Sequence, residues 1–99
     1  MNVKYEGQEF DLDLEDMDTD QARAMERFGV PNLKALEDGV AEGNLDALTV
    51  VYWLMLQQNG DGTRIDRVKF KPIKFLRALA KAQEDDAKDE DPKEDAPSE

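Results

Sequence analysis

The stretch "GNLDALTVVYWLMLQQNG", residues 43–60, decides the fold of this chain. Between Ala47 and Leu56 it holds ten residues, all apolar or amphipathic except Thr49. A helix that is apolar on all sides is usually central and buried. Asn44 is a favoured N-cap residue and Asn59-Gly60 favours a helix end, so we expect a central helix over residues 45–58.

This apolar stretch is too short to cross a membrane, because a spanning helix needs about 20 apolar residues. The first residues, "MNVKYEGQEF", hold no long apolar run after a basic segment. A secretory signal is therefore not expected. We predict no membrane partner for this chain.

Part of the apolar surface around the central helix is expected to stay uncovered, because a chain of 99 residues supplies few neighbouring elements. Exposed aromatic clusters often mark partner sites. Two interpretations remain open: a plain core helix, and a core helix with one edge that faces a partner. For the second, the candidate partner-binding residues are Tyr52, Trp53, Leu56, Phe70 and Phe75.

The residues before this helix predict a hairpin and two shorter helices. "VKYEGQEFDLDL", residues 3–14, alternates about a glycine turn, which indicates a β-hairpin with one apolar face. Asp18 and Gln21 form a capping-box pattern that begins a helix over residues 19–28. A second helix follows Pro31-Asn32, and Gly39 predicts that it is short or loosely held.

"PIKFLRALAKAQ", residues 72–83, predicts an amphipathic helix with a basic edge. Its expected apolar face comprises Ile73, Phe75, Leu76, Leu79 and Ala80. Such a helix can bind a membrane surface, nucleic acid or an acidic partner. It is short for a membrane, and an acidic remainder opposes nucleic acid, so we expect it to pack on the core.

Residues 83–99 lack any large apolar side chain and hold two prolines, so they are expected to be disordered. The sequence thus predicts a mostly α, α+β fold. A small domain over residues 1–82 has an N-terminal β-hairpin followed by three to four short helices. A disordered acidic C-terminal tail follows.

The composition excludes most catalytic and metal chemistry. The chain has 24 acidic and 13 basic residues but neither His nor Cys, which rules out Cys/His zinc sites, disulfides and hydrolytic triads. An EF-hand alignment with Gly62 at the glycine position places Val68 where calcium needs a glutamate. We expect no enzyme, no cofactor and no metal.

Charge is unevenly distributed along the chain. Residues 1–63 carry a net charge of −10, residues 64–82 one of +6 and residues 83–99 one of −7. A basic segment between two acidic ones is attracted to both, within a screening length of about 8–10 Å. The pattern favours internal charge pairing over a nucleic-acid site.

The order of elements resembles the tail assembly chaperones of long-tailed, siphovirus-type phages, especially those of actinobacterial hosts. The hairpin "YEGQEFDLDLEDM" leads into an acidic helix start and a Leu-rich piece, as in that family. "GNLDAL", residues 43–48, then leads into an apolar helix that carries Trp53-Leu54 and ends near a glycine. The resemblance covers about residues 3–80 and rests on capping and core residue types. An acidic end is typical of the family's short product.

The resemblance implies a non-enzymatic chaperone that binds the apolar tape measure protein and keeps it soluble during tail assembly. The tail tube protein, a longer frameshift product and a second copy of the chain are further candidate partners. The implied location is the host cytoplasm, and the chaperone is not expected in the mature virion. The family supplies no catalytic residue to transfer.

Two other classes remain as alternatives. The acidic balance suits a binding protein that mimics DNA or inhibits a basic host protein; such binding would weaken steeply with salt. A structural tail or connector subunit would instead need a surface for stable self-assembly.

Overall fold

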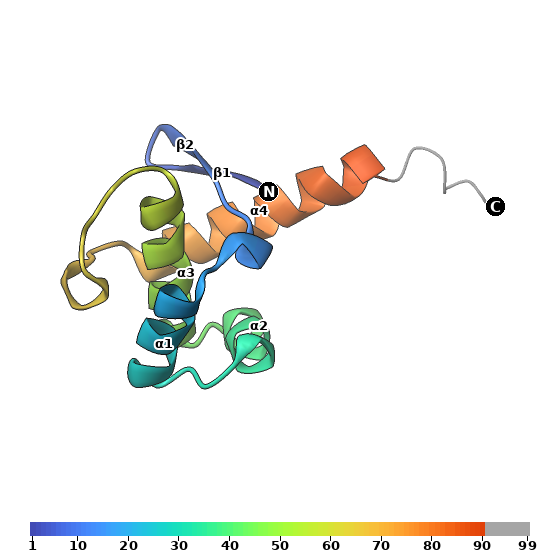
Figure 1. Cartoon of the computed structure of the whole chain (residues 1–99). Coiled ribbons are helices and arrows are strands. Elements are labelled where there is room, and N and C mark those ends of the chain that lie inside the picture. The colour runs from blue at the N-terminus through green and yellow to red at the C-terminus, as the bar shows by residue number, and fades with distance from the viewer. Residues whose placement is uncertain (91–99) are drawn as a thin grey trace.

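The computed structural model describes residues 1–90, with side chains through Glu84. A central helix, α3 (Leu45–Gln58), is surrounded by the hairpin of β1 (Asn2–Tyr5) and β2 (Gln8–Asp11) and by three further helices. These are α1 (Thr19–Arg27), α2 (Leu33–Glu42) and α4 (Pro72–Glu90); two 3-10 turns, η1 (Leu14–Asp16) and η2 (Ile65–Arg67), complete the order (Figure 1). The predicted α+β class, mostly α with an N-terminal hairpin, is confirmed.

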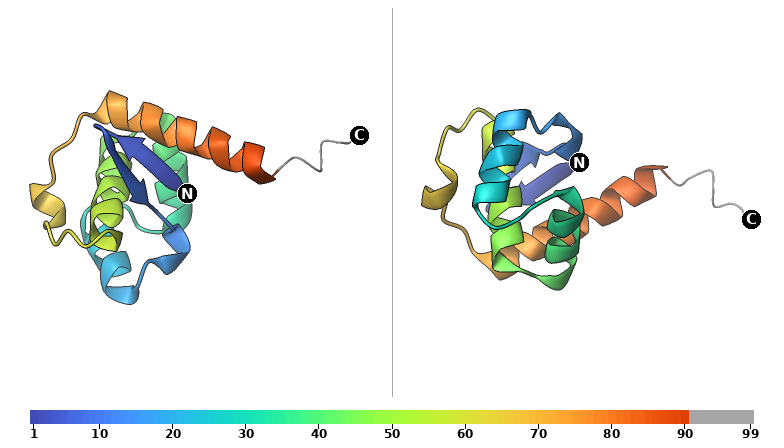
Figure 2. Two further views of the ribbon diagram at one scale, coloured as in Figure 1. Left: turned by 90° about the horizontal axis from the view of Figure 1, so that it is seen from above. Right: turned by 60° about the horizontal axis from the view of Figure 1, so that its bottom comes forward.

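Helix α3 is the core element that its sequence predicts. The Asn44 side chain accepts a hydrogen bond from the Ala47 amide at 3.1 Å, which caps the first turn. Eight of the 14 residues of α3 are buried, and they lie all around its circumference. The hairpin, α2 and α4 each contact it, so the surrounding elements cover most of its apolar surface (Figures 1 and 2).

The hairpin turns at Glu6-Gly7, where both residues have positive φ, 51° and 78°. This conformation matches the right-handed twist of the strands. Side-chain amides at the C-terminal end of α3 then hydrogen-bond to the backbone at the end of β2 and just after it. Asn59 pairs with the backbone of Asp11, and Gln58 pairs with the backbone of Asp13 at 2.7 and 2.8 Å. An isolated hairpin is marginal in water, so these bonds fix it to the helix.

Helix α1 begins with the predicted capping box, in which Asp18 and Gln21 bind each other's backbone amides. Helix α2 is capped by Asn32 and runs unbroken through Gly39 for 10 residues, so of the two expectations it is short and not loosely held. A Cβ atom at position 39 would lie 2.6 Å from the Cβ of Ala47. Glycine is therefore the residue that lets α2 pack closely against α3.

Helix α4 begins at Pro72 as predicted, but it crosses the expected boundary at residue 83 and continues to Glu90. Residues 83–90 contain no Gly or Pro, and Gln, Ala, Lys and Glu are good helix formers. Residues 91–99, the rest of the predicted tail, lie outside the described residues.

The buried stripe of α4 is narrower than the sequence indicates. Phe75, Leu79 and Ala82 are buried against the body of the protein. Ile73 is 69% exposed and Ala80 is also exposed, so both depart from the expected core face. In Figures 1 and 2 the C-terminal part of α4 runs out past the rest of the molecule.

Candidate functional site

A groove lined by aromatic side chains lies between the hairpin turn, α3 and the segment that leads into α4. We call it the aromatic groove. Its volume is about 510 Å³. Its lining residues are Tyr5, Glu6, Gln8, Phe10, Tyr52, Lys69, Phe70 and Lys71.

Four rings build the groove and the core beneath it. Tyr52 and Phe70 are stacked, with centroids 4.8 Å apart and an interplanar angle of 21°. Phe75 meets both rings edge-on, at 5.1 Å from Tyr52 and 5.5 Å from Phe70. Tyr5 adds edge contacts to Tyr52 and Phe75. Because offset-stacked and edge-to-face arrangements are favourable, these rings hold one another in place.

A hydrogen bond joins the hairpin to the segment before α4. The Lys71 amide donates to the Tyr5 hydroxyl at 2.8 Å, across 66 positions of sequence. The bond keeps Phe70, the preceding residue, beside Tyr52. The groove is thus pre-formed by packing and hydrogen bonding, which lowers the entropy lost when a ligand binds.

Tyr52 is half-buried, and among the described residues none hydrogen-bonds its hydroxyl. Burial raises the pKa of Tyr52 above its usual value, and the nearby Tyr5, Asp61 and Glu6 raise this pKa further. The hydroxyl therefore stays protonated at neutral pH. It can donate or accept one hydrogen bond at the edge of an apolar surface.

Charged residues flank the rings on both sides. Lys69 and Lys71 are exposed on one wall, and Glu6 is exposed on the other. Asp61 lies in the turn after α3, where its carboxylate accepts the Thr63 amide at 2.8 Å. Hydrogen bonds from the Thr63 hydroxyl and amide lower the pKa of Asp61. An apolar floor with a polar rim is the usual anatomy of a protein-binding surface.

The groove holds no arrangement suited to metal chemistry. Among the described residues, no group of three His, Cys, Asp or Glu side chains could hold a metal ion. In the same part of the chain, no helix is long and apolar enough to cross a membrane.

The structure brings together three of the five residues singled out from the sequence. Tyr52 and Phe70 line the aromatic groove, and Phe75 lies beneath them. Phe75 is 0% exposed, which agrees with its place on the expected apolar face of α4 but leaves this candidate partner-binding residue no surface of its own. The buried stripe of α4 points this side chain into the core.

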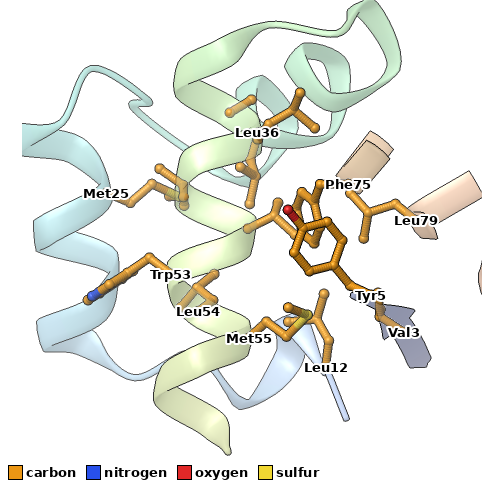
Figure 3. Close-up of a cluster of buried hydrophobic side chains, with 14 of the residues drawn as sticks. Val3, Tyr5, Leu12, Met25, Leu36, Trp53, Leu54, Met55, Phe75 and Leu79 are labelled. Carbon is orange, nitrogen blue, oxygen red and sulfur yellow. The ribbon is translucent and has the colours of Figure 1, made fainter. Parts of the chain in front are cut away.

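The other two residues lie elsewhere. Trp53 is only 7% exposed and points from α3 toward α1, on the side away from Tyr5 and Phe75 (Figure 3). The sequence left the exposure of Trp53 open, and the structure buries this side chain where α1 and the η2 turn flank it. Leu56 is half-buried, one turn after Tyr52, but it does not line the groove.

Sequence reasoning missed Tyr5 and Phe10 as parts of the groove. Their alternation placed them in the hairpin, and that element is confirmed. Their closeness to Phe70 depends on packing between the two ends of the domain. No local pattern reports such a contact.

Comparison with known proteins finds no matching family model, no similar curated protein and no similar solved structure.

Proposed function

We propose that this chain is a tail assembly chaperone of a long-tailed phage. It binds the tape measure protein and keeps it soluble while the tail tube assembles around it. The observation that carries the binding part of the proposal is the aromatic groove, where Tyr52 and Phe70 are stacked and reachable from solvent. The assignment to this family rests on the resemblance of residues 3–80.

The groove suits an apolar protein client. Tyr and other aromatic side chains contribute much binding energy at interfaces, because each covers a large area with few rotatable bonds. Here the rings are already ordered, since Phe75 packs against both Tyr52 and Phe70 and Tyr5 packs against Tyr52. A client segment with one or two apolar anchor residues would fill this volume.

The charge of the chain supports the solubilising role. With a net charge of −11, copies of this chain repel one another, and this repulsion opposes aggregation. A complex of the apolar client with this chain would share that charge, which would keep the client soluble. Proposed further partners are the tail tube protein and a longer frameshift product, with binding in the host cytoplasm and release before the virion is complete.

The alternative of a DNA mimic or an inhibitor of a basic protein draws less support. Several acids are already used to cap local structure: Asp13 caps η1, Asp18 caps α1 and Asp61 caps the turn after α3. Capping explains these acids without an opposing basic surface.

The test is co-expression of the chain with the phage's tape measure protein, with soluble yield and co-purification as readouts. Phe70→Asp and, separately, Phe10→Asp place a charge on the apolar wall of the groove. Both should sharply lower the soluble client fraction. Leu45→Asp is the matched control, because Leu45 is 57% exposed and lies outside the groove.

Circular dichroism of each variant separates loss of binding from loss of fold. If folded Phe70→Asp and Phe10→Asp variants solubilise the client as well as the wild type does, the groove is not the client site. A tape measure protein that stays insoluble with the wild-type chain and with any longer frameshift product would reject the chaperone assignment.

A further inference from the structure

The turn that ends α3 contains a chemically labile pair of residues, Asn59-Gly60. Asparagine is one of the thermolabile residues of proteins. The backbone nitrogen of the next residue can attack its side-chain carbonyl carbon, and a glycine there has no side chain to hinder the approach. The other asparagines of the chain each precede a branched side chain; they are Asn2, Asn32 and Asn44. Asn59 is therefore the asparagine of this sequence most prone to deamidation.

Deamidation at this pair proceeds through a cyclic imide. The Gly60 nitrogen loses its proton and bonds to Cγ of Asn59, while the bond from Cγ to Nδ2 breaks and Nδ2 leaves as ammonia. Water then opens the imide at one of its two carbonyls. Opening at Cγ gives aspartate, and opening at the main-chain carbonyl gives isoaspartate, whose backbone runs through the former side chain. Both products carry a new negative charge.

The pair is open to solvent, but the fold engages both reacting groups. Asn59 and Gly60 are exposed, so water and hydroxide reach them. The Asn59 side-chain nitrogen donates to the carbonyls of Asp11 and Met55 at 2.8 and 2.7 Å, and its oxygen accepts from the Asp11 amide at 3.3 Å. The Gly60 amide donates to the Gln57 carbonyl at 3.2 Å. Because these hydrogen bonds must break before the imide forms, the reaction should follow local opening of the hairpin.

The product does not fit the place of Asn59. A carboxylate oxygen replaces Nδ2 and has no proton to donate. In the present geometry it would lie 2.8 and 2.7 Å from the carbonyl oxygens of Asp11 and Met55, and both would repel it. The new charge also adds to that of Asp61, two residues later. Since Asn59 fastens the end of β2 to α3, its conversion would free this strand.

We propose that Asn59 is a deamidation site which the docked hairpin protects, and that its conversion to aspartate or isoaspartate releases β2 from α3. Tyr5 and Phe10 of the hairpin line the aromatic groove, so the same event would remove a wall of that groove. This inference does not rest on the proposed function, because the reaction needs no partner.

The first test measures the rate of conversion. The full chain is incubated in mildly alkaline buffer, either native or in concentrated urea, and peptide mapping by mass spectrometry follows Asn59. Protection by the fold should make the native rate at least about tenfold lower than the rate in urea. Gln58→Ala should raise the native rate about threefold, because Gln58 holds the backbone of Asp13 through bonds of 2.7 and 2.8 Å. Ile73→Ala, at an exposed position of α4, should leave the rate unchanged.

The second test uses Asn59→Asp, which reproduces one product. Hydrogen exchange of the β1 and β2 amides should be faster in this variant than in the wild type. Asn44→Asp is the matched control, because aspartate caps a helix as well as asparagine does and the hairpin should not change.

Three results would overturn the proposal. The first is an equal rate of conversion of Asn59 in the native chain and in urea. The second is a Gln58→Ala protein that reacts no faster than Ile73→Ala, once each rate is divided by the rate of the same variant in urea. The third is wild-type hairpin exchange in a folded Asn59→Asp protein. If Asn59→Asp does not fold, the two rate measurements remain decisive.

Discussion

Phe70 and Phe75 lie five positions apart and contact each other, yet they have different roles in the fold. Phe75 is fully buried, whereas Phe70 is half-buried and forms a wall of the aromatic groove. Tyr52 stacks on Phe70, is half-buried and lines the same groove. At the scale of single residues, the candidate site therefore depends on which way each ring points.

The ionisation of Tyr52 should affect stability at alkaline pH. Its pKa is raised in the folded protein, chiefly by burial, so folding favours the neutral form. The stabilisation is fully present below the usual tyrosine pKa of about 10 and is lost as pH rises through the folded-state value. Urea unfolding between neutral pH and pH above 10 should therefore show a smaller alkaline loss for Tyr52→Phe than for the wild type. Equal slopes for the two proteins would contradict this prediction.

At the scale of elements, local signals set where helices begin, and contacts between elements decide how firmly they are held. Helix α2 begins at its Asn32 cap, as its sequence indicates. Its tight packing on α3 depends on Gly39 and Ala47, which belong to different helices. The hairpin likewise forms by its turn but is fastened by Asn59 and Gln58 of another element.

Gly39→Ala should destabilise the protein by about 1–2 kcal/mol, although alanine is the better helix former by about 1 kcal/mol. The added Cβ would lie 2.6 Å from that of Ala47, so α2 must move away from α3. Urea denaturation measures the change. Combining it with Ala47→Gly restores the space, and the double-mutant cycle should then show favourable coupling. A Gly39→Ala protein as stable as the wild type would disprove the close contact.

Asn59→Ala should cost about 1–2 kcal/mol of stability and loosen the hairpin. Its side-chain amide donates to the carbonyls of Asp11 and Met55 at 2.8 and 2.7 Å and accepts from the Asp11 amide. Hydrogen exchange of the β1 and β2 amides should become faster. Lys34→Ala is the control, because it removes an exposed ion pair worth only about 0.3–0.5 kcal/mol. Unchanged hairpin exchange would mean that Asn59 does not hold the strand.

At the scale of the whole molecule, α4 fastens the hairpin to the body. It contacts β1 and α3, and its buried side chains fill the space between them. Phe75 is buried, whereas Ile73, two positions earlier on α4, is exposed. Only one narrow stripe of this helix therefore belongs to the core.

Phe75→Ala should therefore destabilise the protein by about 3–5 kcal/mol, because it removes a fully buried ring and leaves a cavity. Ile73→Ala, two positions earlier on the same helix, should change stability by less than about 0.5 kcal/mol. Thermal or urea unfolding of the two variants tests the contrast. A similar loss for both would show that the core stripe of α4 is misplaced.

The candidate site was only partly accessible to sequence reasoning. Tyr52 and Phe70 could be selected because both are large apolar residues near the central helix. Trp53 and Phe75 were selected on the same ground, but the structure buries them. Their neighbours in sequence do not reveal this difference, since burial is decided by α1 on one side of α3 and by the hairpin and α4 on the other (Figure 3).

The sequence by itself determined the local features of this protein: the capping box at Asp18, the caps at Asn32 and Asn44, the hairpin and the segregation of charge. These depend on interactions among residues a few positions apart, which a linear pattern records. Only the tertiary structure decided that Gly39 is a packing contact, that Trp53 and Phe75 are buried, and that Tyr5, Tyr52 and Phe70 line one groove. These depend on contacts such as that between Tyr5 and Lys71, 66 positions apart, where the chain must fold before the partners meet.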